Sequence, residues 1–442
     1  MTDETPTARI KRIEVVGLFG LYNHVIDLKL EDRVTILHGP NGVGKTTLLQ
    51  LIYNFVHGRF DQIVGVHFEE LRLTTTDGLC LSARAFATID GKRPKRERPV
   101  KRKLEISATR AGQPLGESTT ISFTDRPDPY GVAARLFTRS LSHRPNGLEP
   151  PLPSERWYEI DDTRSPLLDH IKVLRAQLIT ADRLVRPIVE ASDDDEVPDP
   201  TGPAIWQHAA VLKQRIAEDW IQYGEVSQHL DRTYPSRLLL GLPADYTMAT
   251  LKPRMEQIEN RRNALRDIGL IDEQIVPFDP NSLDRLPAAQ LGVMGLYVQD
   301  TEKKLATLDP LAQRLSVLLR IVNARFRNKS VLANPQHGLI VLTHEGHPLP
   351  LDALSSGEQH QIILLHDLLF RMPPGTLVLI DEPELSLHVL WQERVLPDLL
   401  EIVNLAGIDI LLATHSPEII GDRTDLTVAL SSKVAHAQLS EA

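Results

Sequence analysis

The segment that most constrains the fold is GPNGVGKTT at residues 39–47, which satisfies the pattern GxxxxGK[ST]. A short β-rich run, Val34 to Leu37, precedes it, and a helix-like run from Thr46 to about Val56 follows. Glycines in such a loop let backbone N–H groups wrap phosphate groups, and the start of the following helix adds its dipole. Although a glycine-rich turn could match by chance, this context favours a phosphate-binding loop. Its candidate residues are Gly39, Pro40, Asn41, Gly42, Val43, Gly44, Lys45, Thr46 and Thr47.

A second motif is the apolar run Leu377 to Ile380, which ends in the carboxylates Asp381 and Glu382. A continuous apolar run is typical of a fully buried parallel strand, and the carboxyl ends of such strands carry ligand sites in α/β sheets. We expect Thr46 and Asp381 to bind Mg²⁺ and Glu382 to orient or deprotonate a water molecule. The alternative is a strand followed by an acidic helix cap.

Two shorter motifs are weaker when each is taken alone. Leu354 to Gln359 places Ser355, Ser356 and Gly357 before an apolar helix, where hydroxyl and N–H groups could face an anion or simply cap the helix. His415 follows the apolar strand ending at Ala413, and a histidine there is more often structural than catalytic. The order of all four motifs along the chain is what makes them informative.

Composition limits the remaining choices. The chain has 442 residues, a formal charge of -10 and a single cysteine, Cys80, which excludes a disulfide framework and fits a reducing, cytoplasmic location. We expect no membrane span, because no apolar stretch approaches about 20 residues, and the polar start shows no secretory signal. The length favours two or three subdomains.

Hydrophobic patterning divides the chain into three expected parts. Residues 1–165 carry strand patterns, including an antiparallel β layer from Leu71 to about Phe123 with a hairpin signal at Asp77-Gly78. Residues 166–330 read as a helical insert, which either packs on itself or protrudes as an antiparallel hairpin. Residues 331–442 return to strands. The helical pattern rests on Leu251, Met255, Ile258, Leu265, Leu308, Leu311, Leu315, Leu318 and Val322.

Together, the four motifs resemble those of the ATP-binding-cassette ATPases, with Leu354–Gln359 as the signature motif and His415 as the switch histidine. The run from Asp381 to His388 and the run from Ala413 to Pro417 are similar to the RecF/OLD-like branch, which includes bacterial anti-phage ATPases such as PtuA. Ser356 and Glu358 depart from the transporter sequence LSGGQ, as is usual in this branch. Residues 180–183 resemble the short arginine-containing stretch of these ATPases, or an ordinary helix end.

The resemblance implies an α/β fold: a P-loop ABC-type ATPase head, with a mixed sheet and an antiparallel β layer, that carries an inserted helical domain. It implies ATP and Mg²⁺ as ligands and a homodimer or higher oligomer whose heads sandwich ATP. Ser355 and Gly357 of one protomer would then contact the γ-phosphate held by Lys45 of the other, and His415 would sense it. Gln50, Gln62 and Gln113 remain equal candidates for the Q-loop glutamine.

Three functions follow from the resemblance. The first is an ATPase in anti-phage defence whose ATP-gated heads control a separate effector, a nuclease or toxin, since we expect no Toprim nuclease within the chain. The second is a RecF-like repair or chromosome-maintenance ATPase that acts directly on DNA. The basic segment 92–103 would then contact phosphates, although it is more simply a solvated loop. The third, a transporter ATPase, is disfavoured by the motif details.

Overall fold

The computed structural model describes residues 8–89, 100–124, 167–179, 204–240, 246–271, 287, 290–386 and 389–430. These residues form two compact units. Unit 1 comprises Met1–Ala181, Pro373–Leu385 and Gln392–Ala442, and unit 2 comprises Asp182–Met372 and Ser386–Trp391.

Unit 1 contains a parallel sheet of five strands, in the order β15-β3-β14-β13-β9. All four pairings are parallel. The central strands β3, β14 and β13 are apolar and almost wholly buried, which confirms the interpretation of their sequences as buried parallel strands. The strands are β3 (Val34–His38), β9 (Ala176–Ile179), β13 (Leu377–Asp381), β14 (Asp409–Ala413) and β15 (Thr427–Ala429).

The second sheet of unit 1 is antiparallel, with the order β2-β1-β4-β5-β6-β7 and β8 paired to β6. Its strands alternate between buried and more accessible residues, as β4 does throughout with buried and partly buried positions. The hairpin expected at Asp77-Gly78 joins β4 to β5. The strands are β1 (Ile10–Leu18), β2 (Tyr22–Asp27), β4 (Glu70–Thr75), β5 (Leu79–Ile89), β6 (Val100–Arg110), β7 (Gln113–Pro114) and β8 (Thr119–Thr124).

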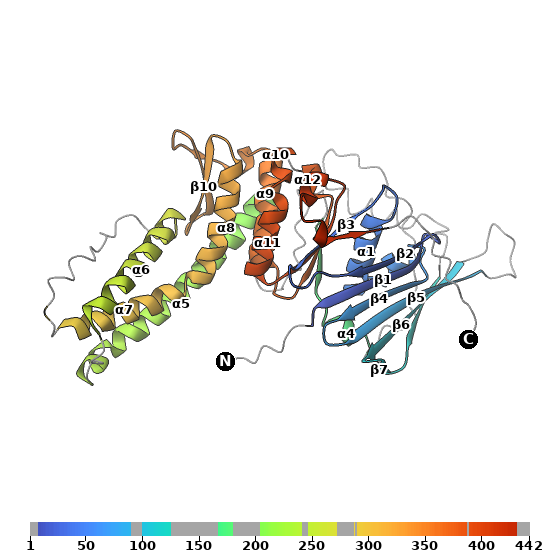
Figure 1. The fold of residues 1–442 in the computed structure, drawn as a ribbon, viewed down its shortest axis with the longest axis horizontal. Helices are drawn as coiled ribbons and strands as arrows, with labels where there is room; N and C mark the ends of the chain where they lie inside the picture. Colours follow the sequence, from blue (N-terminus) through green and yellow to red (C-terminus); the bar gives the residue numbers. More distant parts are fainter. Residues whose placement is uncertain are drawn as a thin grey trace, which may run out of the picture. The chain divides into compact units, whose positions relative to one another are not determined.

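Helix α1 (Lys45–Val56) joins the two sheets of unit 1 (Figure 1). Its buried residues Leu48, Leu49 and Ile52 belong to one apolar cluster with residues of both sheets. The core therefore fixes the start of α1, and with it the loop 39–44, against the ends of the parallel strands. The other helices of unit 1 are α2 (Phe60–Val64), α4 (Leu167–Ile171), α11 (Val395–Ala406), α12 (Pro417–Ile420) and the 3₁₀ turns Pro383–Ser386 and Thr424–Leu426.

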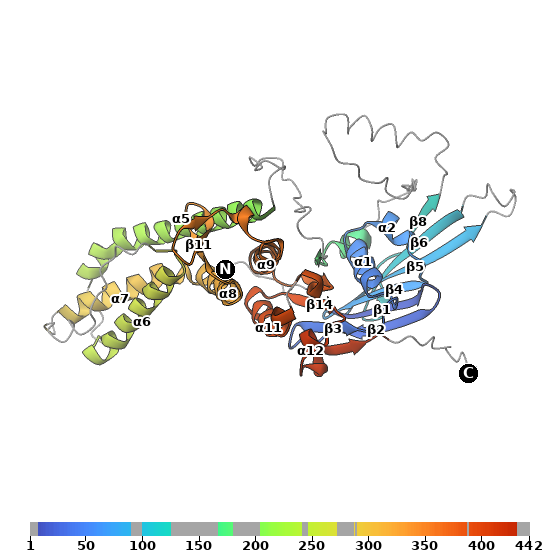
Figure 2. The same ribbon diagram turned by 90° about the horizontal axis from the view of Figure 1, so that it is seen from above.

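Unit 2 contains the long helices and a small antiparallel sheet. Helices α6 and α7 contact each other and α7 contacts α5, so the three lie side by side in Figures 1 and 2. The apolar residues that predicted helices here are buried. The elements are α5 (Ala204–Leu239), α6 (Met248–Asp267), α7 (Leu291–Ala306), α8 (Asp309–Arg325), β10 (Lys329–Asn334), β11 (Gly338–Thr343), β12 (Pro348–Leu349), the 3₁₀ turn Leu351–Ala353, α9 (Ser356–His366) and the π-helix Asp367–Arg371. Along the chain, helix α10 (Val389–Gln392) spans the change from the residues of unit 2 to those of unit 1.

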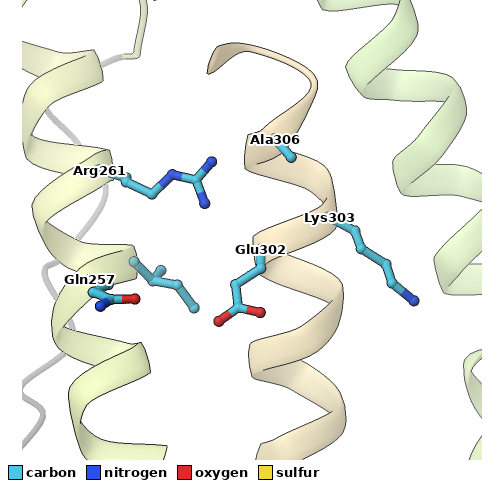
Figure 3. Close-up of a pocket in the computed structure, with 6 residues that line it drawn as sticks. Gln257, Arg261, Glu302, Lys303 and Ala306 are labelled. Atoms are coloured by element: carbon cyan, nitrogen blue, oxygen red, sulfur yellow. The ribbon is translucent and has the colours of Figure 1, made fainter.

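A surface pocket of about 350 Å³ lies between α6 and α7 (Figure 3). Arg261 and Glu302 point toward each other across it. Each forms an ion pair with another residue: Glu302 with Arg254 at 2.6 Å, and Arg261 with Asp309. The first pair connects α6 to α7, and the second connects α6 to the start of α8. Because Tyr246 lies against Gly295 while Arg254 pairs with Glu302, α6 and α7 run parallel, so these two helices do not form the antiparallel hairpin considered from the sequence.

Two segments depart from the expected bounds. Residues 167–179, assigned from the sequence to the helical insert, form α4 and β9, and β9 pairs with β13 in the parallel sheet. Four residues are too few for a strand pattern to be distinguished from its surroundings. Residues 331–372, assigned to the C-terminal part of the head, group with the helices of unit 2. The division into three domains stays a prediction. The compact units differ from it at residues 167–179 and 331–372.

The α/β fold is confirmed: a P-loop follows a central parallel strand, an antiparallel β layer accompanies the parallel sheet, and a helical unit is inserted between the segments of unit 1. Within the described part of the chain, every helix is too short or too polar to cross a membrane.

Candidate functional site

The loop between β3 and α1 has the backbone that a phosphate-binding loop needs. Gly42 and Gly44 have φ angles of 82° and 93°, a left-handed region that favours glycine. At Gly44, which caps α1, a Cβ atom would lie 2.7 Å from Leu18 Cδ2. By contrast, Gly42 has open space around it. The loop is also supported from β2, where His24 Nε2 lies 3.1 Å from the carbonyl oxygen of Val43.

Lys45 is buried at the start of α1, although lysine is rarely buried. Its Nζ donates to the carbonyl oxygens of Gly39 at 3.0 Å and Pro40 at 3.4 Å. Burial lowers its pKa, against the attraction of Glu382, Asp381 and Glu384. The ammonium group is therefore held inside the loop among three carboxylates.

His415, which follows the end of β14, contacts this lysine: its Nε2 lies 2.5 Å from Lys45 Nζ. The resemblance implied a functional histidine at this position; the structure brings its side chain to the loop, and its role stays a prediction. The same Nε2 lies 4.0 Å from Glu382 Oε1, so lysine, histidine and glutamate form a contiguous cluster. The cluster joins the ends of β13 and β14, which are neighbours in the sheet.

Glu384 is a member of the site that the sequence analysis missed. Its Oε1 accepts hydrogen bonds from Thr414 Oγ1 at 2.8 Å and from the backbone N–H of His415 at 2.7 Å. It therefore fixes the segment that carries His415. Its position two residues after Glu382 was visible in the sequence, but no spacing rule distinguishes it from an ordinary acidic turn residue.

Asp381 has the environment of a metal ligand. Thr46 donates a hydrogen bond to it, while its Oδ1 is buried without a hydrogen-bond partner among the described residues. Burial raises its pKa, although Thr46 and Lys45 oppose the change. An unpartnered buried carboxylate oxygen beside a threonine hydroxyl fits Mg²⁺, which prefers such oxygen ligands.

Glu382 follows at the end of β13 with φ 45°, an uncommon conformation for a residue other than glycine. Its backbone N–H donates to the carbonyl oxygen of Ala413 at 2.9 Å, which holds this conformation in place. Backbone strain of this kind is concentrated at functional sites.

The Ser-Ser-Gly turn lies in unit 2 and caps α9. Ser355 Oγ accepts from the N–H of Glu358, and the Ser355 N–H donates to Glu358 Oε2 at 2.8 Å, which together form a capping box. Lys329 Nζ lies 2.8 Å from the same Glu358 oxygen. Ser356 is exposed, and Gly357 is partly exposed. The structure thus shows the helix-cap role of Ser355, while contact of this turn with a second protomer stays a prediction.

For the remaining residues singled out in the sequence, the structure gives at most a location or a contact and does not test a role. Gln50, Gln62 and Gln113 are all exposed, so the choice among them stays open. His388 and residues 180–183 lie outside the described residues. The basic segment is described only from residue 100, where Arg102 donates to the carbonyl oxygen of Val64 and Lys103 is exposed. Arg102 thus has a structural contact, and a role for the segment in DNA binding stays a prediction.

Residues 34–421 match the AAA_21 family, described as "AAA domain, putative AbiEii toxin, Type IV TA system". Among solved structures, the chain is similar to the Smc head domain of Pyrococcus furiosus bound to the C-terminal domain of ScpA, at 12% identity and a TM-score of 0.39, with 96% of this chain and 94% of that chain covered. It is also similar to the SMC head domain of Thermotoga maritima, at 11% identity and a TM-score of 0.33, with 93% and 91% covered.

Proposed function

We propose, from the premise that this chain belongs to the AAA_21 family of AAA-domain proteins, that it binds and hydrolyses ATP at the loop 39–47. The observation that carries the proposal is the buried Lys45, enclosed by loop carbonyls and His415 and surrounded by three carboxylates. A lysine in that place exchanges its internal partners for the β- and γ-phosphates of a nucleotide.

Each residue of the site has a role in this proposal. The N–H groups of the loop and the start of α1 bind the phosphates. Thr46 and Asp381 would hold Mg²⁺, which supplies charge neutralisation to the phosphate oxygens when bound. Glu382 orients the attacking water and accepts its proton, and His415, held by Glu384, faces the γ-phosphate position.

The finer proposal is that ATP closes two heads into a dimer that controls a separate effector in bacterial anti-phage defence. Its support is the turn Ser355–Gly357 at the start of α9, in which Ser355 and Ser356 are exposed and Gly357 is partly exposed. ATP would act as an interface ligand, because it binds the closed pair and hydrolysis removes it. A cytoplasmic location belongs to the same proposal.

Glu382→Gln tests both levels. The amide cannot accept the water's proton, so we expect Mg²⁺–ATP to bind normally while turnover falls by about 100-fold or more. Light scattering after size exclusion should then show a dimer that forms with ATP and persists. Glu393→Gln, an exposed glutamate of unit 1, is the matched control and should turn over ATP normally. If the oligomeric state changes neither with ATP nor with the mutation, the proposed ATP-gated dimerisation is contradicted, but ATP hydrolysis is not.

Adding Ser356→Arg to Glu382→Gln tests the turn itself. Ser356 is exposed and does not provide the capping side chain of α9, so a bulky residue there should leave the fold intact. We expect ATP to bind with unchanged affinity while the dimer is lost. A dimer of undiminished stability would exclude this turn from the interface.

A further inference from the structure

Three ligand atoms converge inside unit 2, where α5 meets the end of α9. His208 Nδ1 lies 2.9 Å from His366 Nδ1 and 3.4 Å from Asp367 Oδ1. His366 Nδ1 lies 3.8 Å from the same carboxylate oxygen. The His366 side chain is fully buried, and the His208 side chain is 4% exposed. None of the three contributes to the proposed ATP site.

The triangle has the dimensions of one face of a metal coordination shell. Zinc binds histidine nitrogen and carboxylate oxygen at about 2.0–2.2 Å, so tetrahedral ligand atoms lie about 3.3–3.6 Å apart. The observed separations of 2.9, 3.4 and 3.8 Å are centred on that range. An ion needs only small side-chain adjustments to bond all three atoms.

The surrounding structure fixes the three side chains before any ion binds. The His208 and His366 rings pack edge to face at 4.9 Å, and His366 stacks on Phe370 at 5.5 Å. Arg371 Nη1 lies 3.4 Å from Asp367 Oδ1 and orients the carboxylate. Asp367 begins a π-helix, an irregularity that places it and His366 on the same side toward α5. Such π-helical turns occur frequently at functional sites.

We propose that His208, His366 and Asp367 form a binding site for one divalent transition-metal ion of the Zn²⁺ class. Two imidazole nitrogens and one carboxylate oxygen suit Zn²⁺, Co²⁺ or Ni²⁺, whereas Mg²⁺ prefers a shell made of oxygens. The fourth position would be filled by water. The bound ion links α5 to the carboxyl end of α9, whose other end is capped by Ser355.

The experiment uses the full-length, tag-free chain, freed of metal by a chelator and kept without nucleotide. Co²⁺ is the probe, because its visible absorption intensifies in a four-coordinate site. We expect one Co²⁺ per chain, displaced by one equivalent of Zn²⁺ and not by millimolar Mg²⁺. Zn²⁺ should also raise the melting temperature, since it binds the folded state.

Two variants and one control locate the ion. His208→Gln and Asp367→Asn should each weaken Co²⁺ binding at least about 100-fold, because the loss of a second-shell partner already costs up to that much. Asp367 is partly exposed, so its substitution keeps the test valid if the buried His208 variant folds poorly. His229→Gln, an exposed histidine of the same helix, should bind as the parent does. The proposal is overturned if the parent takes up no stoichiometric Co²⁺ or Zn²⁺, or if both ligand variants bind with the parent's affinity.

Discussion

At the scale of single residues, the site around Lys45 keeps polar atoms buried without partners. Asp381 Oδ1 and Glu384 Oε2 both lack a hydrogen-bond partner in the described part of the chain. Each buried, unpaired polar atom costs the folded state free energy. A site of this kind is arranged for a ligand and lowers the stability of the ligand-free protein.

Asp381→Asn tests this cost. In the folded protein the pKa of Asp381 is raised above its ordinary value near 4. The group therefore contributes fully to the stability of the folded state only below that ordinary pKa, where it is protonated. This stabilisation is lost as pH rises through the pKa of the folded state. At pH 7 the ionised carboxylate therefore destabilises the folded state, and the neutral amide of the variant should raise the melting temperature of the nucleotide-free protein. The difference between variant and parent should shrink as pH falls toward 4, and a variant that melts below its parent at pH 7 would contradict this.

Glu384→Ala tests the positioning of His415. Without the acceptor for the Thr414 hydroxyl and the His415 N–H, the histidine should lose its orientation. We expect kcat to fall by about 10- to 100-fold while ATP affinity changes little, since small misplacements of catalytic groups have effects of this size. Glu384→Gln retains an acceptor oxygen and should recover most of the activity. Equal losses in both variants would point to the charge of Glu384 instead.

At the scale of elements, the start of helix α9 is stabilised by Lys329, a residue of strand β10. Burial alone would raise the pKa of Glu358, but hydrogen bonds from Lys329 and Ser355 outweigh it and lower the pKa. Because a lowered acid pKa stabilises the folded state only above its ordinary value, this contribution is present at pH 7 and lost as pH falls below about 4. Lys329 on β10 thus supports the turn that carries Ser355.

Lys329→Met removes that support. We expect it to lower the free energy of unfolding by about 1.5–3 kcal/mol at pH 7, the range for a hydrogen bond to a charged group. Lys303→Met, an exposed lysine of α7, is the control and should change stability little. If both substitutions have the same effect, the Lys329–Glu358 pair does not stabilise α9.

The elements also show what the sequence could predict. The strands β13 and β14 were predictable because each is an apolar run beside a motif, and β3 and helix α1 were predictable because they flank the phosphate-binding pattern. Strand β9 was not, because its four residues pair with β13 from 201 positions away in the chain. Glu384 and the His208–His366–Asp367 cluster were missed for the same reason: only the folded chain brings their partners together.

At the scale of the whole molecule, the chain places its nucleotide motifs on two compact units. The phosphate-binding loop, Asp381, Glu382 and His415 belong to unit 1, while the turn Ser355–Gly357 belongs to unit 2. In the proposed function, ATP hydrolysis and dimer closure are therefore separable, and variants of one unit should affect them differently. A variant of unit 1 that no longer binds ATP should lose both ATP hydrolysis and dimer closure.

The most direct test is a calorimetric titration of Mg²⁺–ATP into the parent and into Lys45→Ala. We predict one ATP per chain for the parent and an affinity about 10- to 100-fold lower for the variant, because it loses charge-assisted contacts with the phosphates. Lys172→Ala, an exposed lysine of unit 1, should bind as the parent does. Equal affinity of Lys45→Ala and the parent would contradict the assignment of the loop 39–47 as the ATP site.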